Sequence, residues 1–219
     1  MPDTPAPDHP YTADYYLNGV ASGLSNYENY QWLPDKTGPM AWQLRWLLGI
    51  KGGEVVLDYG CARGYLVRAL RKMANVDAYG YDISEWAIAN CDPDMKEFVS
   101  NELQTGDMIW DHVIAKDVLE HVPLDTLDKL IPKLLPSIRK QLFIIVPLTD
   151  RTDGPYLCPV DEMDSTHGLR WTLPDWLEYL QKFDKRFVVT GGYEAPVIKP
   201  NCYEFPRSYG FITVRRLLP

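Results

Sequence analysis

The chain has 219 residues, of which 46% are hydrophobic and 24% charged, a composition that favours one globular domain and excludes disordered and collagen-like chains. Its 22 basic and 30 acidic residues give a formal net charge of −8, which disfavours nucleic acid and anionic membranes as partners. The apolar runs fall far short of the about 20 residues that a membrane helix needs. The N-terminus lacks a signal-like run and the four cysteines are scattered, so we expect a reduced, cytoplasmic protein without a disulfide framework.

Residues 1–38 form a leader that is rich in Pro, Asp, Asn and Tyr and has little hydrophobic periodicity. Two interpretations stay open: a tail packed on the surface, or a lid whose aromatic side chains close over a ligand. Tyr27, Tyr30 and Trp32 favour the lid, because aromatic faces attract cations. We expect residues 39–219 to form a single domain that opens with a helix over about 39–48.

From residue 54 onward, predicted strands and helices alternate. Short apolar runs predict strands at residues 54–58, 77–82, 98–99, 111–116, 142–146, 187–189 and 211–214. Helices are predicted at residues 64–74, 84–90, about 127–138, and from a Thr172 cap onward. Pro132 and Pro136 are expected to kink or break the third helix. This alternation predicts an α/β fold with a doubly wound, mostly parallel sheet and helices on both faces.

The segment between the fifth strand and the Thr172 cap, residues 148–171, is predicted to be a long loop. A loop of that length in a compact domain is often functional. We therefore expect it to line the substrate side of the site.

The first strand ends in an acid and a glycine turn. Asp58 is followed by Gly60, Ala62 and Gly64, and then by a helix. Dinucleotide-binding turns read G-x-G-x-x-G and hold a pyrophosphate at the helix N-terminus, so this turn matches them poorly. The acid before the glycines would repel a phosphate and suits a cationic ligand, which disfavours a nucleotide-dependent oxidoreductase.

Four segments resemble those of the class I S-adenosylmethionine-dependent methyltransferases. Residues 57–64 (Leu-Asp-Tyr-Gly-Cys-Ala-Arg-Gly) resemble motif I of that family, and Asp82 ends the second strand as the family's ribose-binding acid does. Residues 111–122 and 164–172 resemble the segments after strands four and five in the small-molecule branch, of the type 11 and type 23 kind. The resemblance implies a Rossmann-like sheet of seven strands with an antiparallel last strand, and S-adenosylmethionine as the cofactor.

The resemblance also implies cofactor-binding roles. Asp58 would lie near the methionine end of the cofactor, and Asp82 would accept the ribose hydroxyls. Backbone at the glycine turn would pass beside the cofactor, and the other contacts would come from elements farther along the chain and from the leader. The residues implied are Asp58, Gly60, Cys61, Gly64, Asp82, Ile83, Asn101, Asp117 and Tyr30.

Several of these roles have plainer alternatives. Asp58 and Asp82 could be simple turn acids. Ile83, which the resemblance implies to stack on adenine, could be core, and Trp86, a second candidate for that stacking, could be helix packing. Ala62 replaces the middle glycine of motif I. Its methyl is tolerated if its φ is negative, whereas a positive φ or a closer contact would weaken cofactor binding.

Methyl transfer often needs a base for the proton of the acceptor. His121, after strand four, and His167, in the long loop, are the candidates, and Asp164 could orient a histidine. Both histidines could instead only fix the backbone. Asp161, Glu162, Asp164 and His167 are residue types that ligate hard metals, but acidic loops are common and we expect no metal.

The predicted function is in-line methyl transfer from S-adenosylmethionine to a small molecule, such as a sugar, a phenol or quinone, or a natural product. Nucleic-acid methylation is disfavoured, because the chain has no basic stripe and no N-P-P-Y type motif. Ala62 motivates an alternative, a catalytically silent S-adenosylmethionine-binding pseudoenzyme or regulatory subunit. The acceptor and the oligomeric state leave no readable pattern.

Overall fold

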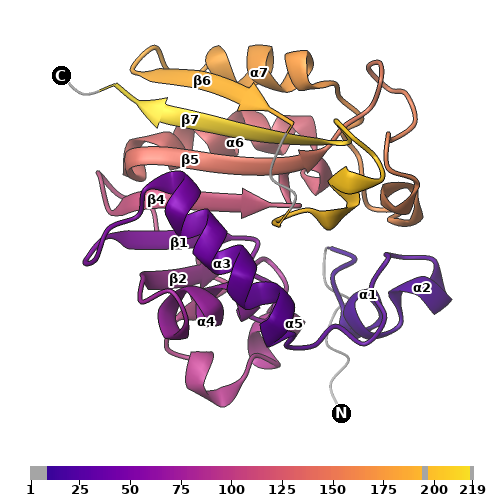
Figure 1. The fold of residues 1–219 in the computed structure, drawn as a ribbon, viewed down its shortest axis with the longest axis horizontal. Helices are drawn as coiled ribbons and strands as arrows, with labels where there is room; N and C mark the ends of the chain where they lie inside the picture. Colours follow the sequence, from indigo (N-terminus) through magenta and orange to yellow (C-terminus); the bar gives the residue numbers. More distant parts are fainter. Residues whose placement is uncertain (1–8, 194–196, 218–219) are drawn as a thin grey trace.

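A computed structural model describes residues 9–193 and 197–217 of the chain (Figure 1). Its seven-stranded sheet has the order β3-β2-β1-β4-β5-β7-β6. All neighbouring pairs are parallel except those of β7, which runs antiparallel to β5 and β6. This confirms the predicted sheet. The strands are β1 Val55–Tyr59, β2 Asp77–Tyr81, β3 Val99–Ser100, β4 Trp110–Lys116, β5 Ile138–Pro147, β6 Phe187–Gly192 and β7 Tyr209–Arg216.

Helices cover both faces of the sheet, so each face has its own apolar core. On one face α3 and α4 pack over residues such as Val56 and Ile145, and on the other α6 and α7 pack over residues such as Val113 and Ile144. The α-helices are α1 Ala13–Leu17, α2 Gly19–Ser22, α3 Pro34–Leu48, α4 Tyr65–Lys72, α5 Glu85–Ala89, α6 Leu124–Leu134 and α7 Leu173–Gln181. Within the described residues, no helix is both long and apolar enough to cross a membrane.

The two predicted helix caps form as expected. The Ser84 hydroxyl accepts the backbone N–H of Ala87 at 3.1 Å and opens α5. Thr172 and Asp175 form a complete capping box at the start of α7. These caps satisfy backbone donors that the first helical turn leaves free.

Three of the differences from the predicted element boundaries have a clear physical reason. α3 begins at Pro34 rather than near residue 39, because proline at the first helical position loses no hydrogen bond. α6 runs through Pro132 and ends at Leu134, with Pro136 in the 3-10 turn that follows, so the expected break falls only at Pro136. β5 is longer than its apolar run, since Arg139 and Lys140 extend it as exposed residues.

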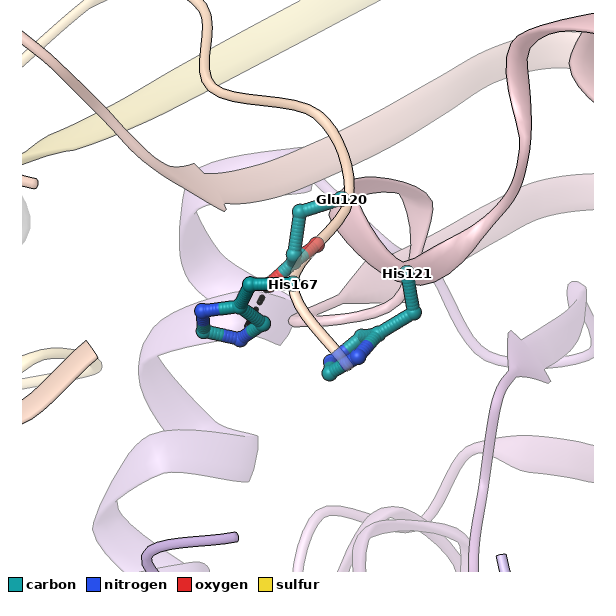
Figure 2. A group of neighbouring side chains, drawn as sticks. All are labelled: Glu120, His121 and His167. Carbon is teal, nitrogen blue, oxygen red and sulfur yellow. Dashed lines mark ion pairs between the residues drawn. The ribbon is translucent and has the colours of Figure 1, made fainter. Parts of the chain in front are cut away.

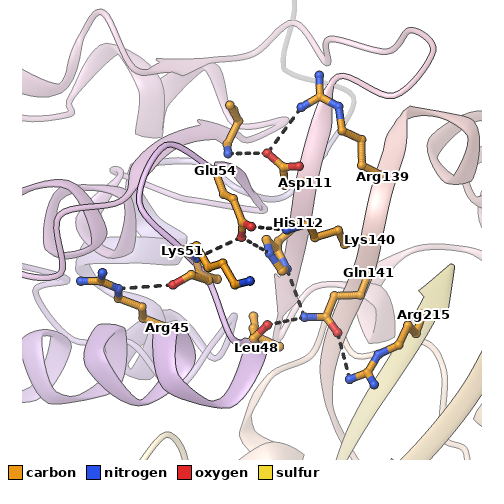
Figure 3. Close-up of polar contacts among 12 residues, drawn as sticks. Arg45, Leu48, Lys51, Glu54, Asp111, His112, Arg139, Lys140, Gln141 and Arg215 are labelled. Carbon is orange, nitrogen blue, oxygen red and sulfur yellow. Dashed lines mark hydrogen bonds and ion pairs between the residues drawn. The ribbon is translucent and has the colours of Figure 1, made fainter. Parts of the chain in front are cut away.

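A buried polar network ties α3, β4, β5 and β7 together near the amino end of β1 (Figure 3). The Gln141 amide donates to the Leu48 carbonyl at 2.8 Å and to His112 Nδ1 at 3.1 Å. His112 Nε2 then lies 2.9 Å from Glu54 Oε2. A structural role in this network accounts for His112, far from the carboxyl ends of the strands.

The leader and the long loop meet at the carboxyl edge of the parallel strands (Figure 1). Ser165 donates to the Leu24 carbonyl through its backbone N–H at 3.2 Å and its hydroxyl at 3.1 Å. The Ser84 hydroxyl donates to the Tyr11 carbonyl at 2.6 Å. Open α/β sheets bind their ligands at this edge, so both segments are in contact with the expected site.

Candidate cofactor and acceptor site

The turn between β1 and α4 requires glycine at two positions. Gly60 has φ +83° and Gly64 has φ +77°. A Cβ at Gly60 would lie 2.2 Å from Val118 Cγ2, and one at Gly64 would lie 2.8 Å from Val99 Cγ1. The backbone of this turn therefore packs directly against side chains from the segment after β4 and from β3, so glycine is needed for close packing as well as for the positive φ.

Ala62 takes the left-handed conformation, with φ +49°. Its backbone N–H donates to Asp82 Oδ2 at 2.6 Å, which holds the turn against the end of β2. A residue with a Cβ pays about 1–2 kcal/mol for this conformation. The condition under which alanine would replace glycine without strain, a negative φ, is therefore not met.

Asp58 and Asp82 are both buried at the carboxyl edge. Asp58 accepts no side-chain hydrogen bond from the residues that the structure describes, and burial raises its pKa to about 7 although Lys116 opposes the shift. Asp82 accepts the backbone N–H groups of Ala62 and Ser84, yet burial still raises its pKa. Asp82 thus does serve the turn, and its carboxylate keeps lone pairs for a further donor.

The remaining predicted contacts differ in how accessible they are. Ile83 is 52% exposed, so the alternative of a core residue is wrong. Asn101 is exposed just after β3, whereas Cys61 is buried and burial raises its pKa. Trp86 stacks on Tyr16 with ring centroids 5.4 Å apart, which supports packing rather than a free adenine platform.

The leader forms an aromatic cluster on top of the glycine turn. Tyr15 and Tyr16 are its buried centre, and Ala62 and Trp86 pack against them. Tyr30 stacks on Tyr65 of α4 at 5.2 Å, and its carbonyl accepts from Arg63 at 3.1 Å. The leader therefore contacts the elements that would surround the cofactor.

Asp117, expected on the amino-group side of the cofactor, is paired with two lysines. Lys116 Nζ lies 2.5 Å and Lys199 Nζ 2.7 Å from its Oδ2. Although burial opposes the shift, the two lysines hold the pKa of Asp117 well below its usual range. Its negative charge is therefore already compensated inside the chain, and Oδ1 is the oxygen without a hydrogen-bond partner in the described residues.

The Asp164 side chain orients His121, and not His167, although His167 is closer to it in the sequence. Asp164 Oδ2 accepts from the Tyr15 hydroxyl at 2.7 Å, and Oδ1 accepts from the Thr166 hydroxyl at 2.5 Å. Because that hydroxyl gives its proton to Asp164, it accepts from His121 Nδ1, 2.7 Å away. His121 is therefore protonated at Nδ1 and keeps a lone pair on Nε2.

His167 has the same tautomer by a different route. Its Nδ1 lies 2.8 Å from the Asp161 carbonyl oxygen, which can only accept, so Nδ1 carries the proton. The rings of His121 and His167 are 4.6 Å apart. Burial lowers the pKa of His121 to about 4 and lowers that of His167, so both imidazoles are neutral near pH 7.

Glu120 completes this group and was not a predicted site residue (Figure 2). Its side chain is 0% exposed, and Oε1 lies 4.0 Å from His167 Nε2. Neither carboxylate oxygen has a hydrogen-bond partner within the described parts of the chain. Burial, reinforced by the charge of Asp117, raises the pKa of Glu120 well above its usual range. In the sequence, the feature that could have identified Glu120 is an acid beside Leu119 in a mostly apolar stretch.

Comparisons with known proteins agree with this architecture. The profile of a family described as methyltransferase domain matches residues 41–184. An S-adenosylmethionine-dependent methyltransferase structure from Archaeoglobus fulgidus is 19% identical with a TM-score of 0.58, covering 81% of this chain and 92% of its own. The Burkholderia thailandensis 1,6-didemethyltoxoflavin-N1-methyltransferase, solved with 1,6-didemethyltoxoflavin and S-adenosylhomocysteine, is 18% identical with a TM-score of 0.57, covering 84% and 79%. No curated protein matches in sequence.

The fold and the glycine-turn edge define a Rossmann-like methyltransferase. Since the family profile covers most of its length, the chain belongs to the methyltransferase domain family. The cofactor expected from the sequence, S-adenosylmethionine, fits the residues present. Asp58 and Asp82 offer buried carboxylates at this edge to a cationic ligand with hydroxyl groups.

Proposed function

We propose that this enzyme methylates a small molecule, a sugar, a phenol or quinone, or another natural product, held between the leader and residues 148–171. One observation carries the proposal. His121 and His167 come from two segments, lie 4.6 Å apart, and each keeps an unprotonated Nε2 at the edge where the cofactor belongs. Two aligned proton acceptors at this position suit an acceptor that must lose a proton.

Aromatic side chains around the two imidazoles support a small, flat acceptor. Tyr11 lies 5.9 Å from the His121 ring, and Tyr156 lies 5.1 Å from the His167 ring, both edge-to-face. Such walls favour rings and sugar faces over extended polymers. The structural neighbour from Burkholderia thailandensis was solved with 1,6-didemethyltoxoflavin bound, and a net charge of −8 disfavours nucleic acid.

The residues of this chain would divide the work as follows. Asp82 and Asp58 bind the cofactor, which when bound supplies an electrophilic methyl group on a sulfonium. His121 Nε2 would accept the proton that the acceptor hydroxyl loses on methylation. Asp164 acts as a positioning residue, because through Thr166 it fixes the His121 tautomer.

The leader would act as the lid of this site. Its tyrosines pack on Ala62 and Trp86 and reach Asp164 through Tyr15. Deleting residues 1–35 is expected to weaken cofactor affinity and slow methyl transfer, measured by calorimetry and by product formation. Unchanged affinity and rate would favour the surface-tail alternative.

The first test is cofactor binding. At about 100 times its Kd, S-adenosylhomocysteine should stabilise the protein by about 2.7 kcal/mol and raise its Tm by roughly 5–10 °C. NAD should give no shift, and Asp82→Ala should lose the effect. A shift with NAD alone would contradict the proposed cofactor site.

The second test is catalysis against a panel of phenols, quinones and sugars, read by mass shift of the product. His121→Gln should lower kcat by about 10²–10⁴-fold while it binds S-adenosylhomocysteine as the wild type does. His112→Gln is the matched control, because His112 lies in the structural network near the amino end of β1. Cofactor binding without turnover on any acceptor class would favour the silent, cofactor-binding alternative.

A further inference from the structure

We propose that Glu120, His121 and His167 form a binding site for one divalent transition-metal ion, for which Zn²⁺ is the probe (Figure 2). Each residue offers one ligand atom, and the three atoms lie within 4.8 Å of one another. They come from the turn after β4 and from the loop after β5, which are joined where Gly168 and Leu169 donate to the Glu120 carbonyl at 2.9 and 3.0 Å. The site is therefore assembled by the backbone without any ion.

Both imidazoles are arranged as metal-ligating histidines are. His121 donates through Nδ1 to Thr166, and His167 donates through Nδ1 to the Asp161 carbonyl. Outer partners of this kind fix the ring and leave the Nε2 lone pair for the metal. The carboxylate–hydroxyl–imidazole chain behind His121 begins at Asp164, which is itself buried.

Glu120 supplies a second, independent observation. Its side chain is fully buried, and its two oxygens are without hydrogen-bond partners in the described residues. Burying a carboxyl group whose oxygens have no hydrogen-bond partner costs several times more folding free energy than burying one whose oxygens are hydrogen-bonded. A bound cation would satisfy this group, and its oxygen Oε1 already lies 4.0 Å from His167 Nε2.

The donor set selects the class of ion. Two imidazole nitrogens and one carboxylate oxygen with an open position are typical of catalytic Zn²⁺ and related transition metals. Mg²⁺ and Ca²⁺ prefer oxygen-only sites. The ligand atoms, which lie within 4.8 Å of one another, need to approach by up to about 1.4 Å to reach the about 3.4 Å ligand spacing of a tetrahedral zinc site.

Two of the three acids that the sequence suggested as metal ligands are engaged elsewhere, and the third, Asp161, has an unpartnered buried Oδ2 within the described residues but lies outside the group of three potential ligands. Asp164 accepts hydrogen bonds from Tyr15 and Thr166, and Glu162 forms a two-pronged ion pair with Arg170. The tertiary structure therefore shifts the candidate site from the acidic loop to the two histidines and Glu120. Where the proposed function holds, the open coordination position would receive an oxygen of the methyl acceptor, which metals acidify. In that metal-bound form the ion, and not His121 Nε2, would promote loss of the acceptor proton, which would pass to solvent; His121 would act as the base only in the metal-free protein.

The test measures metal binding without cofactor or acceptor. Full-length protein is stripped with a chelator, dialysed and titrated with Zn²⁺ by calorimetry, and Co²⁺ is added in parallel to read visible absorption. We expect one ion per chain. Glu120→Gln, His121→Gln and His167→Gln should each weaken binding by at least about 100-fold, and Thr166→Val by roughly 10–100-fold.

His112→Gln is the matched control, since His112 is an imidazole outside the group, in the network near the amino end of β1; its affinity should equal that of the wild type. Circular dichroism on each variant separates loss of the metal site from loss of the fold. If a ligand variant does not fold, Thr166→Val still tests the site, because it removes the hydrogen-bond partner of His121 and leaves all three ligands in place. Binding of less than one ion per chain, or equal affinity in the wild type and the folded ligand variants, would overturn the metal site. Methyl transfer by the chelated protein in that case would leave the proposed function standing.

Discussion

Replacing Ala62 by glycine measures how much the left-handed backbone conformation of this residue destabilises the protein. Ala62 has φ +49°, a conformation that costs a residue with a Cβ about 1–2 kcal/mol. Glycine removes that cost, but its freer unfolded chain offsets about 0.4–1 kcal/mol of the gain. The half-buried methyl that packs against the leader offsets about 0.3 kcal/mol more. The expected net effect is a stabilisation of about 0.5 kcal/mol, or 1–2 °C in Tm.

Urea unfolding of a graded series measures this prediction. Ala62→Gly should be slightly more stable than the wild type, and Ala62→Val less stable, because a β-branched residue is a stronger outlier at positive φ. Calorimetry with S-adenosylhomocysteine should show that Ala62→Gly binds at least as tightly as the wild type. A glycine variant less stable than the wild type by more than about 0.5 kcal/mol would refute the assignment of strain to this residue.

Three further predictions concern charge and packing. Since burial raises the pKa of Asp58 to about 7, affinity for the cationic S-adenosylmethionine should rise about fivefold from pH 6 to pH 7; Asp58→Asn should abolish this slope in calorimetry, and a persisting slope would assign it to another group. Gly60→Ala should lose about 3 kcal/mol in urea unfolding, because its Cβ would lie 2.2 Å from Val118 Cγ2; a loss below about 1 kcal/mol would contradict that packing. Although burial opposes the shift, hydrogen bonds from Lys140, the Lys51 backbone and His112 lower the pKa of Glu54 to about 2. Its carboxylate should therefore contribute about 2 kcal/mol of stability above pH 4.5 that is lost as the pH falls towards 2. When the free energy of unfolding is measured against pH, Glu54→Gln should lose less stability than the wild type over this range. Equal losses in the wild type and the variant would contradict the prediction.

Local sequence patterns were sufficient to predict those parts of the structure that a few adjacent residues decide. The glycine turn after an acid-ended strand, the Ser84 cap and the Thr172–Asp175 capping box all form as predicted. The alternation of strands and helices predicted the mostly parallel sheet, and the resemblance to class I methyltransferases implied its antiparallel last strand; both are confirmed. These features depend on backbone conformation and hydrogen bonds within one or two turns of chain, so spacing alone reveals them.

Prediction was weaker at polar residues inside regular elements. Arg139 and Lys140 hid the first part of β5, because exposed charged side chains interrupt an apolar run without interrupting backbone pairing. Pro132 did not end α6, since apolar residues such as Leu127 and Ile131 bury that helix on the sheet. Here burial outweighs the local preference that the sequence expresses.

The sequence by itself determined the fold, the chemical class of the cofactor, and the edge of the sheet where we propose that the cofactor binds. Only the tertiary structure decided that Asp164 reaches His121 through Thr166, that Glu120 is buried without a partner, and that Ala62 has a positive φ. Each of these depends on segments from the leader, the turn after β4 and the loop after β5 meeting at one edge. Contacts between such distant segments arise from burial of the whole core, and no local spacing encodes them.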